Sequence, residues 1–164
     1  MGPSGAITVR SRIQPGDIGA IVSMHGLLYA REHGFDHTFE AYVAGPLAEF
    51  ACRTSPRERI WIAERAGAPV GCIAIVEVDA AVAQLRWYLV VPEARGCGLG
   101  TTLLHEAVTF CREQGYRSII LWTVSALEAA ARLYRAAGFR LVESQPGRHW
   151  GVDVVEEKYE LSLG

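Results

Sequence analysis

Apolar positions recur along the chain with two different periods, and the changes of period predict its elements. Residues 7–13 alternate apolar and polar side chains, which is typical of a half-buried strand. Helical spacing follows twice, over residues 17–34 and again over residues 36–50. Pro46 lies inside the second of these segments, and we expect it to kink or split the helix because proline lacks a backbone N–H group.

The remaining elements follow from the same reasoning. They are strands at 60–66, 70–78 and 82–91, a helix at 98–113, a strand at 118–123, a helix at 125–137, and strands at 139–142 and 152–163. A turn at Gly67-Ala68-Pro69 joins the first two of these strands. Seven strands and four helices in this order indicate the α/β (α+β) class, and 164 residues fit one domain over residues 1–164.

Charge and cysteine usage restrict the class of function. The net charge is -2, with no basic stripe, so we expect neither nucleic acid nor an anionic membrane as partner. The first residues lack a charged segment followed by an apolar core, and no apolar run is long enough to span a membrane. Four separated cysteines show no zinc spacing or disulfide framework, which favours a reduced, cytoplasmic protein without a metal.

A glycine-rich turn links the strand at 82–91 to the helix at 98–113. Such a turn leaves backbone N–H groups free at the positive end of the helix dipole, where phosphate binds well. The nucleotide P-loop is excluded because Gly100 is followed by Thr101 rather than by lysine. The dinucleotide fingerprint is excluded because the next strand carries no carboxylate. The turn therefore predicts binding of some other phosphorylated ligand.

Two motifs carry a resemblance to a known family. Arg95, Gly98 and Gly100 fill the pattern Arg-x-x-Gly-x-Gly after a strand that ends in Val-Val-Pro, and Tyr134 begins the pattern Tyr-x-x-x-Gly-Phe. The chain thereby resembles the GNAT superfamily of N-acetyltransferases. The resemblance implies acetyl-CoA as co-substrate and a mixed, mostly antiparallel seven-stranded sheet, splayed between the strands at 82–91 and 118–123.

The resemblance also implies the site residues. Tyr134 would act as general acid toward the sulfur of CoA, and a backbone N–H group near the end of the strand at 82–91 would polarise the acetyl carbonyl. We expect Cys97 to contribute its N–H group rather than a reactive thiol. The residues expected to bind acetyl-CoA are Leu89, Val90, Val91, Arg95, Gly96, Cys97, Gly98, Leu99, Gly100 and Thr101.

The general base is not identified by the motifs. Some family members place a glutamate where this chain has Trp122, and a frequent asparagine of the family is replaced by Leu127. A water chain without a dedicated base is an equal alternative. The candidate side chains are Glu32, Asp36, His37, Glu77 and Asp79. The four tryptophans are interpreted as hydrophobic packing.

Two functions remain open at this level. The first is acetyl transfer from acetyl-CoA to a primary amine of a small molecule or protein, by direct attack on the thioester, with the amine entering beside the first two helices. The alternative is a non-catalytic domain that binds acyl-CoA. Over its whole length the chain looks most like the acetyltransferase part associated with some MarR-type regulators, and a homodimer is left open.

Overall fold

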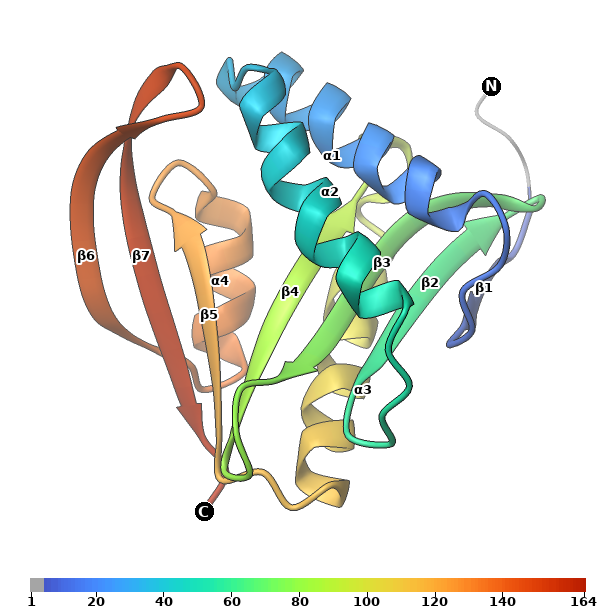
Figure 1. The fold of residues 1–164 in the computed structure, drawn as a ribbon, viewed down its shortest axis with the longest axis vertical. Helices are drawn as coiled ribbons and strands as arrows, with labels where there is room; N and C mark the ends of the chain where they lie inside the picture. The colour runs from blue at the N-terminus through green and yellow to red at the C-terminus, as the bar shows by residue number, and fades with distance from the viewer. Residues whose placement is uncertain (1–4) are drawn as a thin grey trace.

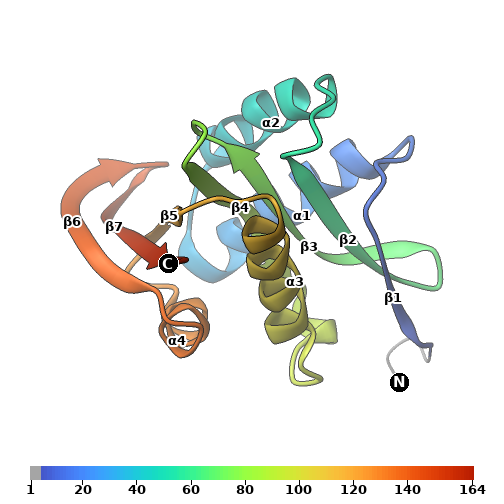
Figure 2. The same cartoon turned by 90° about the horizontal axis from the view of Figure 1, so that it is seen from below.

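The protein is built around a seven-stranded sheet that carries two helices on each face. The computed structural model describes residues 5–164 and gives the strand order β1-β2-β3-β4-β5-β7-β6. Neighbouring strands are antiparallel except β4 and β5, which are parallel. Helices α1 and α2 cover one face of the sheet, and α3 and α4 cover the other (Figure 1 and Figure 2). The predicted fold class and the seven-stranded mixed sheet are confirmed.

The elements follow the predicted order. They are β1 (Ile7–Arg10), α1 (Asp17–His33), α2 (His37–Ala51), β2 (Arg59–Arg65), β3 (Ala68–Glu77), β4 (Val82–Val90), the 3-10 turn η1 (Pro92–Ala94), α3 (Leu99–Glu113), β5 (Ser118–Val124), α4 (Glu128–Ala136), β6 (Arg140–His149) and β7 (Val152–Ser162). None of the helices within residues 5–164 is long and apolar enough to cross a bilayer.

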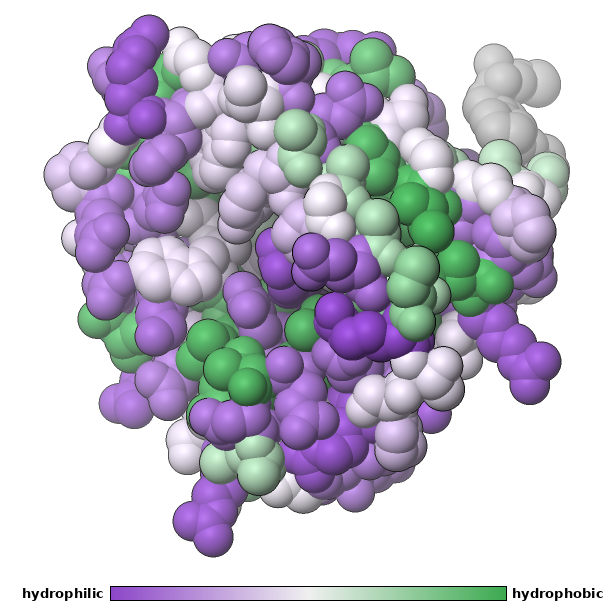
Figure 3. Space-filling view, in the orientation of Figure 1, coloured by the Kyte–Doolittle hydropathy of each residue, from purple (hydrophilic) through white to green (hydrophobic). Residues whose placement is uncertain are grey.

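Two hydrophobic cores lie on the two faces of the sheet. Because successive side chains of a strand point to opposite faces, β3 contributes Ile73 to the core under α3 and α4 and Cys72 to the core under α1 and α2. Burial on both faces explains why β3 reads as a nearly continuous apolar run. The outer surface seen in Figure 3 is mostly hydrophilic, with hydrophobic residues gathered mainly along a diagonal over α1 and α2.

The parallel pairing of β4 with β5 is short. It covers only Val82 to Gln84 of β4, and the two strands separate beyond that point. On its other side β4 stays paired with β3, through a β-bulge at Trp87, whose φ of 49° is unusual for a non-glycine residue. The bulge and the short pairing leave one edge of β4 open toward β5, so the predicted splaying of these strands is present.

The first strand is shorter than predicted. It ends at Arg10 instead of residue 13, and Val9, expected to be buried, is 41% exposed. The cause is ionic: Arg10 turns inward and lies 2.7 Å from the buried carboxylate of Asp17 and 3.1 Å from Glu64. The Arg10 guanidinium, together with the backbone N–H of Gln14, holds the pKa of Asp17 below its usual value. The chain leaves the sheet here and begins α1 at Asp17.

Helix α2 runs through Pro46 as one helix, so of the two effects expected of this proline the split is absent. Two other boundary predictions are wrong. The hairpin turn between β2 and β3 is Ala66-Gly67, both with positive φ, one residue earlier than predicted. Strand β6 extends to His149 instead of ending at residue 142, because it pairs with β7 over its whole length although nearly all of its side chains are exposed.

Candidate active site

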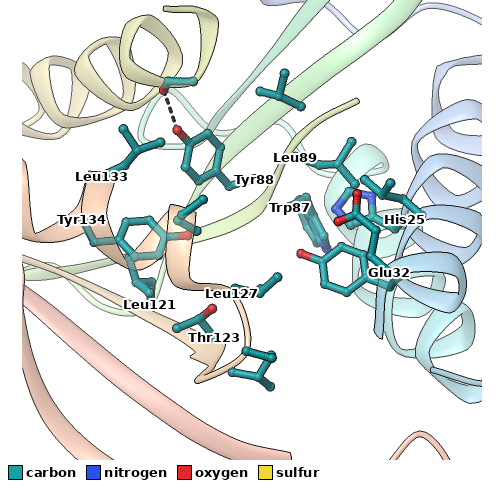
Figure 4. A pocket seen from close by; sticks show the side chains of 18 of the residues that line it. His25, Glu32, Trp87, Tyr88, Leu89, Leu121, Thr123, Leu127, Leu133 and Tyr134 are labelled. Carbon is teal, nitrogen blue, oxygen red and sulfur yellow. Dashed lines mark hydrogen bonds between the residues drawn. The ribbon is translucent and has the colours of Figure 1, made fainter. Parts of the chain in front are cut away.

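A large cavity passes through the opening between β4 and β5. Its volume is about 870 Å³, within the range of small-molecule sites. Helices α1 and α2 line one side of it, and the start of α3 together with α4 lines the other. Figure 4 shows this division: Tyr88, Leu133 and Tyr134 lie across the cavity from His25, Glu32 and Trp87. The cavity therefore connects the glycine-rich turn to the acceptor side predicted from the sequence.

The glycine-rich turn presents an unoccupied row of backbone donors. The N–H groups of residues 96–101 make no hydrogen bond within residues 5–164, and the N-cap of α3, Gly98, has no side-chain cap. Gly96 and Gly98 adopt φ values of 83° and 82°, which L side chains rarely take. Free donors at the start of a 15-residue helix fit the diphosphate of CoA.

Gly100 is required for a different reason. A Cβ atom at this position would lie 2.9 Å from the hydroxyl of Tyr88 and 3.3 Å from Leu133. The Tyr88 hydroxyl donates a 2.5 Å hydrogen bond to the Gly100 carbonyl, which ties the first turn of α3 to β4. The glycine thus allows the helix to approach the wall of the cavity closely.

Arg95 is not directed at the turn in this structure. Its guanidinium lies 3.1 Å from the carboxylate of Glu32, and its Nε donates to the carbonyl oxygen of Val90 over 3.1 Å. The side chain is 48% exposed and lies at the wall of the cavity. Arg95 therefore bridges β4 and α1, a role that the motif alone did not indicate.

Main-chain groups of Val90 face the open edge of β4. Val91 donates its N–H to Val70 on the β3 side, and because direction alternates along a strand, Val90 points the other way. Among the residues expected to bind acetyl-CoA, all line the cavity except Val91 and Cys97. The thiol of Cys97 is turned to the carbonyl of Ala94, at 3.2 Å. The N–H of Val90 thus faces the open edge of β4, where the sequence predicts the acetyl carbonyl.

Tyr134 lies at the junction of core and cavity. It is 5% exposed, packs 5.8 Å from Phe139 and 5.9 Å from Tyr88 by ring centroids, and lines the cavity. In Figure 4 its hydroxyl points toward the middle of the cavity. Tyr134 therefore packs in the core with its ring and still presents its hydroxyl to the cavity.

Burial raises the pKa of Tyr134 well above its ordinary value, with smaller contributions from neighbouring tyrosines. The phenol therefore keeps its proton at neutral pH. Proton transfer to a thiolate with a reference pKa of about 8.5 would be uphill in water. The same desolvation raises the pKa of a thiol that leaves beside Tyr134, which offsets the rise in the pKa of the tyrosine and favours hydrogen bonding to the sulfur.

Only Glu32 among the five candidate bases lines the cavity. Asp36 caps α2 by accepting from the backbone of Thr38. Glu77 pairs with Arg57 at 3.3 Å, and Asp79 accepts from the turn before β4. His37 is exposed at the start of α2 and outside the cavity wall.

His25 is a cavity residue that the sequence did not single out. Its Nδ1 lies 2.8 Å from the carbonyl oxygen of Ile21, and since a carbonyl only accepts, Nδ1 carries the proton. Desolvation lowers the pKa of this 3% exposed side chain to about 4, so the ring is neutral. Nothing at sequence level separated His25 from an ordinary apolar-face histidine, because the helical period places it among core positions.

The α1–α2 side of the cavity is rich in aromatic rings. The hairpin between β6 and β7 docks on the loop between α1 and α2, where Asp36 donates its N–H to the carbonyl of Trp150 over 2.9 Å. Three of the four tryptophans line the cavity, namely Trp87, Trp122 and Trp150, so their interpretation as packing alone is incomplete. Trp61 is buried in the core under α3, as predicted.

Comparisons with known sequences give one family. The model of the acetyltransferase (GNAT) family matches residues 24–139. An uncharacterized N-acetyltransferase of Schizosaccharomyces pombe is 32% identical over 118 residues, which cover 70% of this chain and 72% of that protein. N-acetyltransferase family 8 member 2 of Rattus norvegicus is 30% identical over 63% of this chain, but this match spans only 46% of the rat protein.

Solved structures agree on the fold. An N-acetyltransferase from Staphylococcus aureus Mu50 superposes with a TM-score of 0.78 at 19% identity, over 97% of this chain and 99% of that one. The Salmonella typhimurium protein yncA, solved with its cofactor acetyl-CoA, has a TM-score of 0.77 at 20% identity, over 97% and 95% of the two chains. The family match and the N-acetyltransferase relatives support an acetyltransferase enzyme over a domain that only binds acyl-CoA. The resemblance to MarR-associated proteins stays a prediction.

Proposed function

Since the chain belongs to the GNAT family of acetyltransferases, we propose that it transfers the acetyl group of acetyl-CoA to a primary amine by direct attack on the thioester. The observation that carries this proposal is the continuity of the cavity. It runs from the free N–H groups of residues 96–101, past the open edge of β4 at Val90, to the hydroxyl side of Tyr134. The groups that would bind the phosphate, bind the carbonyl and donate the proton therefore lie along one path, which supports the proposal.

In this arrangement the N–H groups of residues 96–101 hold the diphosphate of acetyl-CoA. The pantetheine arm lies along the open edge of β4, and the acetyl carbonyl accepts a hydrogen bond from the N–H of Val90. A preorganised backbone donor stabilises the negative charge that develops on this oxygen without reorganisation during the reaction.

The amine reaches the acetyl carbon from the α1–α2 side. Its nitrogen lone pair forms the C–N bond, and collapse of the tetrahedral intermediate breaks the C–S bond. The proton of Tyr134 passes to the departing sulfur, and a proton from nitrogen passes to Glu32, directly or through water. Glu32 then releases its proton to solvent and Tyr134 takes one up, which restores the enzyme, and the products are the acetamide and CoA.

The test is thiol release from acetyl-CoA across a panel of primary amines and peptides with free amino groups. We expect release that saturates with at least one amine and yields its acetylated product by mass spectrometry. A rate that no acceptor raises above hydrolysis, in protein that binds acetyl-CoA, would overturn the proposal and return the chain to the non-catalytic alternative.

A further inference from the structure

The acceptor side of the cavity is bounded by a continuous set of aromatic rings from three separate segments. Its members are Tyr29, Phe35, Phe39, Tyr42 and Trp150, which we call the aromatic wall. Adjacent ring centroids lie 4.5 to 6.1 Å apart, in the range of favourable aromatic contacts. Trp150 joins the wall because the hairpin tip docks on the loop before α2.

Part of this wall is not packed by the protein itself. Tyr42 remains 48% exposed although it contacts Trp150, with their centroids 5.4 Å apart. On the sheet side, Trp122 of β5 is 37% exposed and also lines the cavity. Large rings left open in a concave site indicate a ligand with a flat apolar group.

Arg86 lies next to the aromatic wall and makes no ion pair within the described chain. Its guanidinium carbon lies 6.0 Å from the centroid of Tyr42 and 5.0 Å from that of Trp87. Within residues 5–164 it makes no hydrogen bond or ion pair. Three glutamates line the same cavity. Glu32 is paired with Arg95 and Glu156 with His149, at 3.1 and 3.2 Å, and Glu128 lies at the start of α4.

The indole of Trp87 adds a second unused donor. The side chain is 7% exposed and lines the cavity, yet its Nε1–H has no partner within the described chain. A buried donor without an acceptor carries a free-energy cost unless a ligand supplies one. Arg86 and Trp87 are neighbours on β4, placed on the same face by the β-bulge.

We infer that the acceptor is a primary amine that carries both an aromatic ring and a carboxylate, as an aromatic amino acid does. The ring stacks against the aromatic wall at Tyr42 and Trp150. The carboxylate binds Arg86, whose planar guanidinium suits bidentate binding, and the Trp87 N–H is available to the same group. This inference rests on the proposed function and specifies its acceptor.

Three amines separate the contribution of the aromatic ring from that of the carboxylate. L-Phenylalanine has both, phenethylamine lacks the carboxylate, and L-alanine lacks the ring. We expect kcat/KM to be about tenfold or more higher for phenylalanine than for either of the others, since each loses one charge-assisted or aromatic contact. Binding of each probe to the CoA complex, followed by calorimetry, gives the same order without depending on turnover.

Variants assign each preference to its residue. Arg86→Gln should bring the phenylalanine-to-phenethylamine ratio close to one, and Trp150→Ala should do so for the phenylalanine-to-alanine ratio. Tyr42→Leu provides a second test of the wall at an exposed position, in case Trp150→Ala disturbs the hairpin. Lys158→Gln is the matched control. Lys158 lies above the Trp122 ring but does not line the cavity, so the variant removes a cation and should keep both wild-type ratios.

The outcomes are distinct. Preference for alanine or phenethylamine over phenylalanine in both turnover and binding overturns this inference and leaves acetyl transfer intact. The inference is also overturned if Lys158→Gln and Arg86→Gln lower the two substrate ratios equally. The overall positive charge of the site, rather than Arg86 itself, would then select the carboxylate. Binding of phenylalanine in the expected order with no acetylation of any amine would sustain the inferred ligand class and refute the proposed function.

Discussion

A carboxylate oxygen of Glu32 on α1 lies 3.1 Å from the guanidinium of Arg95, just before the glycine-rich turn. This ion pair crosses the cavity and joins the predicted phosphate side to the predicted acceptor side. It also neutralises the one arginine of the motif. The pair therefore couples the two halves of the site. We expect a substitution of Glu32 to affect CoA binding and the rate of acetyl transfer in opposite directions.

Glu32→Gln should tighten CoA binding while slowing acetyl transfer. Without the carboxylate, Arg95 is free for the diphosphate, and exposed pairs of this kind are worth about 0.2 to 1 kcal/mol, so the Kd for CoA should fall by up to about fivefold. Loss of the proton acceptor should lower kcat by about tenfold or more. Calorimetry and thiol release measure the two effects.

Arg95→Gln is the complementary variant and should raise the Kd for CoA, with a weaker dependence on salt. Glu93→Gln, an exposed change on η1 outside the cavity wall, is the matched control. If Glu32→Gln leaves both CoA affinity and kcat at wild-type values, the coupling across the cavity is absent.

Gly100→Ala should both destabilise the fold and weaken CoA binding. The added methyl would meet the Tyr88 hydroxyl at 2.9 Å, and overpacking of this kind costs about 1 to 3 kcal/mol. At Gly98 an added side chain would meet nothing within 4 Å, but the φ of 82° is unfavourable for it. In Gly98→Asp the negative charge would repel the diphosphate and should abolish the thermal stabilisation by CoA. Thermal melts with and without CoA measure both effects.

Gly19→Ala serves as the control for these glycine substitutions. It lies within α1, where a methyl group would meet nothing within 4 Å, so it should stabilise the helix by about 0.5 to 1 kcal/mol and keep the CoA-induced shift. A full CoA shift in Gly98→Asp would remove the turn from the binding site.

Tyr134→Phe should lower kcat by about 10²-fold and leave the Kd for acetyl-CoA nearly unchanged, because the ring still packs while the proton donor is lost. Tyr159→Phe is a matched control. Its ring is buried 5.8 Å from that of Tyr134, but its hydroxyl accepts from Arg135 outside the cavity. Equal loss of kcat in the two variants, measured by thiol release, would indicate a structural role for Tyr134.

Stability should fall in mild acid because of His25. Its pKa is about 4 in the folded protein and 6.5 ordinarily, so the unfolded chain binds the proton first. The stabilisation is fully present above pH 6.5 and is lost as pH falls toward 4, by about 3 kcal/mol in total. Urea unfolding at a series of pH values measures this slope.

His25→Gln should flatten the dependence of the unfolding free energy over that interval. The neutral side chain can still donate to the carbonyl of Ile21, but it takes up no proton. An unchanged slope in the variant would assign the acid sensitivity to other groups, such as the Asp17 carboxylate paired with Arg10.

The amino-acid sequence by itself determined the local elements and the donor side of the site. Hydrophobic period located the helices and strands, since burial of one face requires it. The glycines at 96, 98 and 100 and the tyrosine at 134 were found because each satisfies a local requirement, either a positive φ, a close approach or a fixed spacing on a helix. Such requirements are met by residues that are close together in the sequence, so the sequence alone reveals them.

The tertiary structure alone decided the acceptor side. Trp150 follows an exposed, polar strand without a hydrophobic period, and only its pairing with β7 carries it to Phe35 and Tyr42. The β-bulge at Trp87 and the pairing of Arg95 with Glu32 likewise join positions far apart in the chain. No local pattern encodes these contacts, because their free energy depends on which distant surfaces the folded sheet brings together.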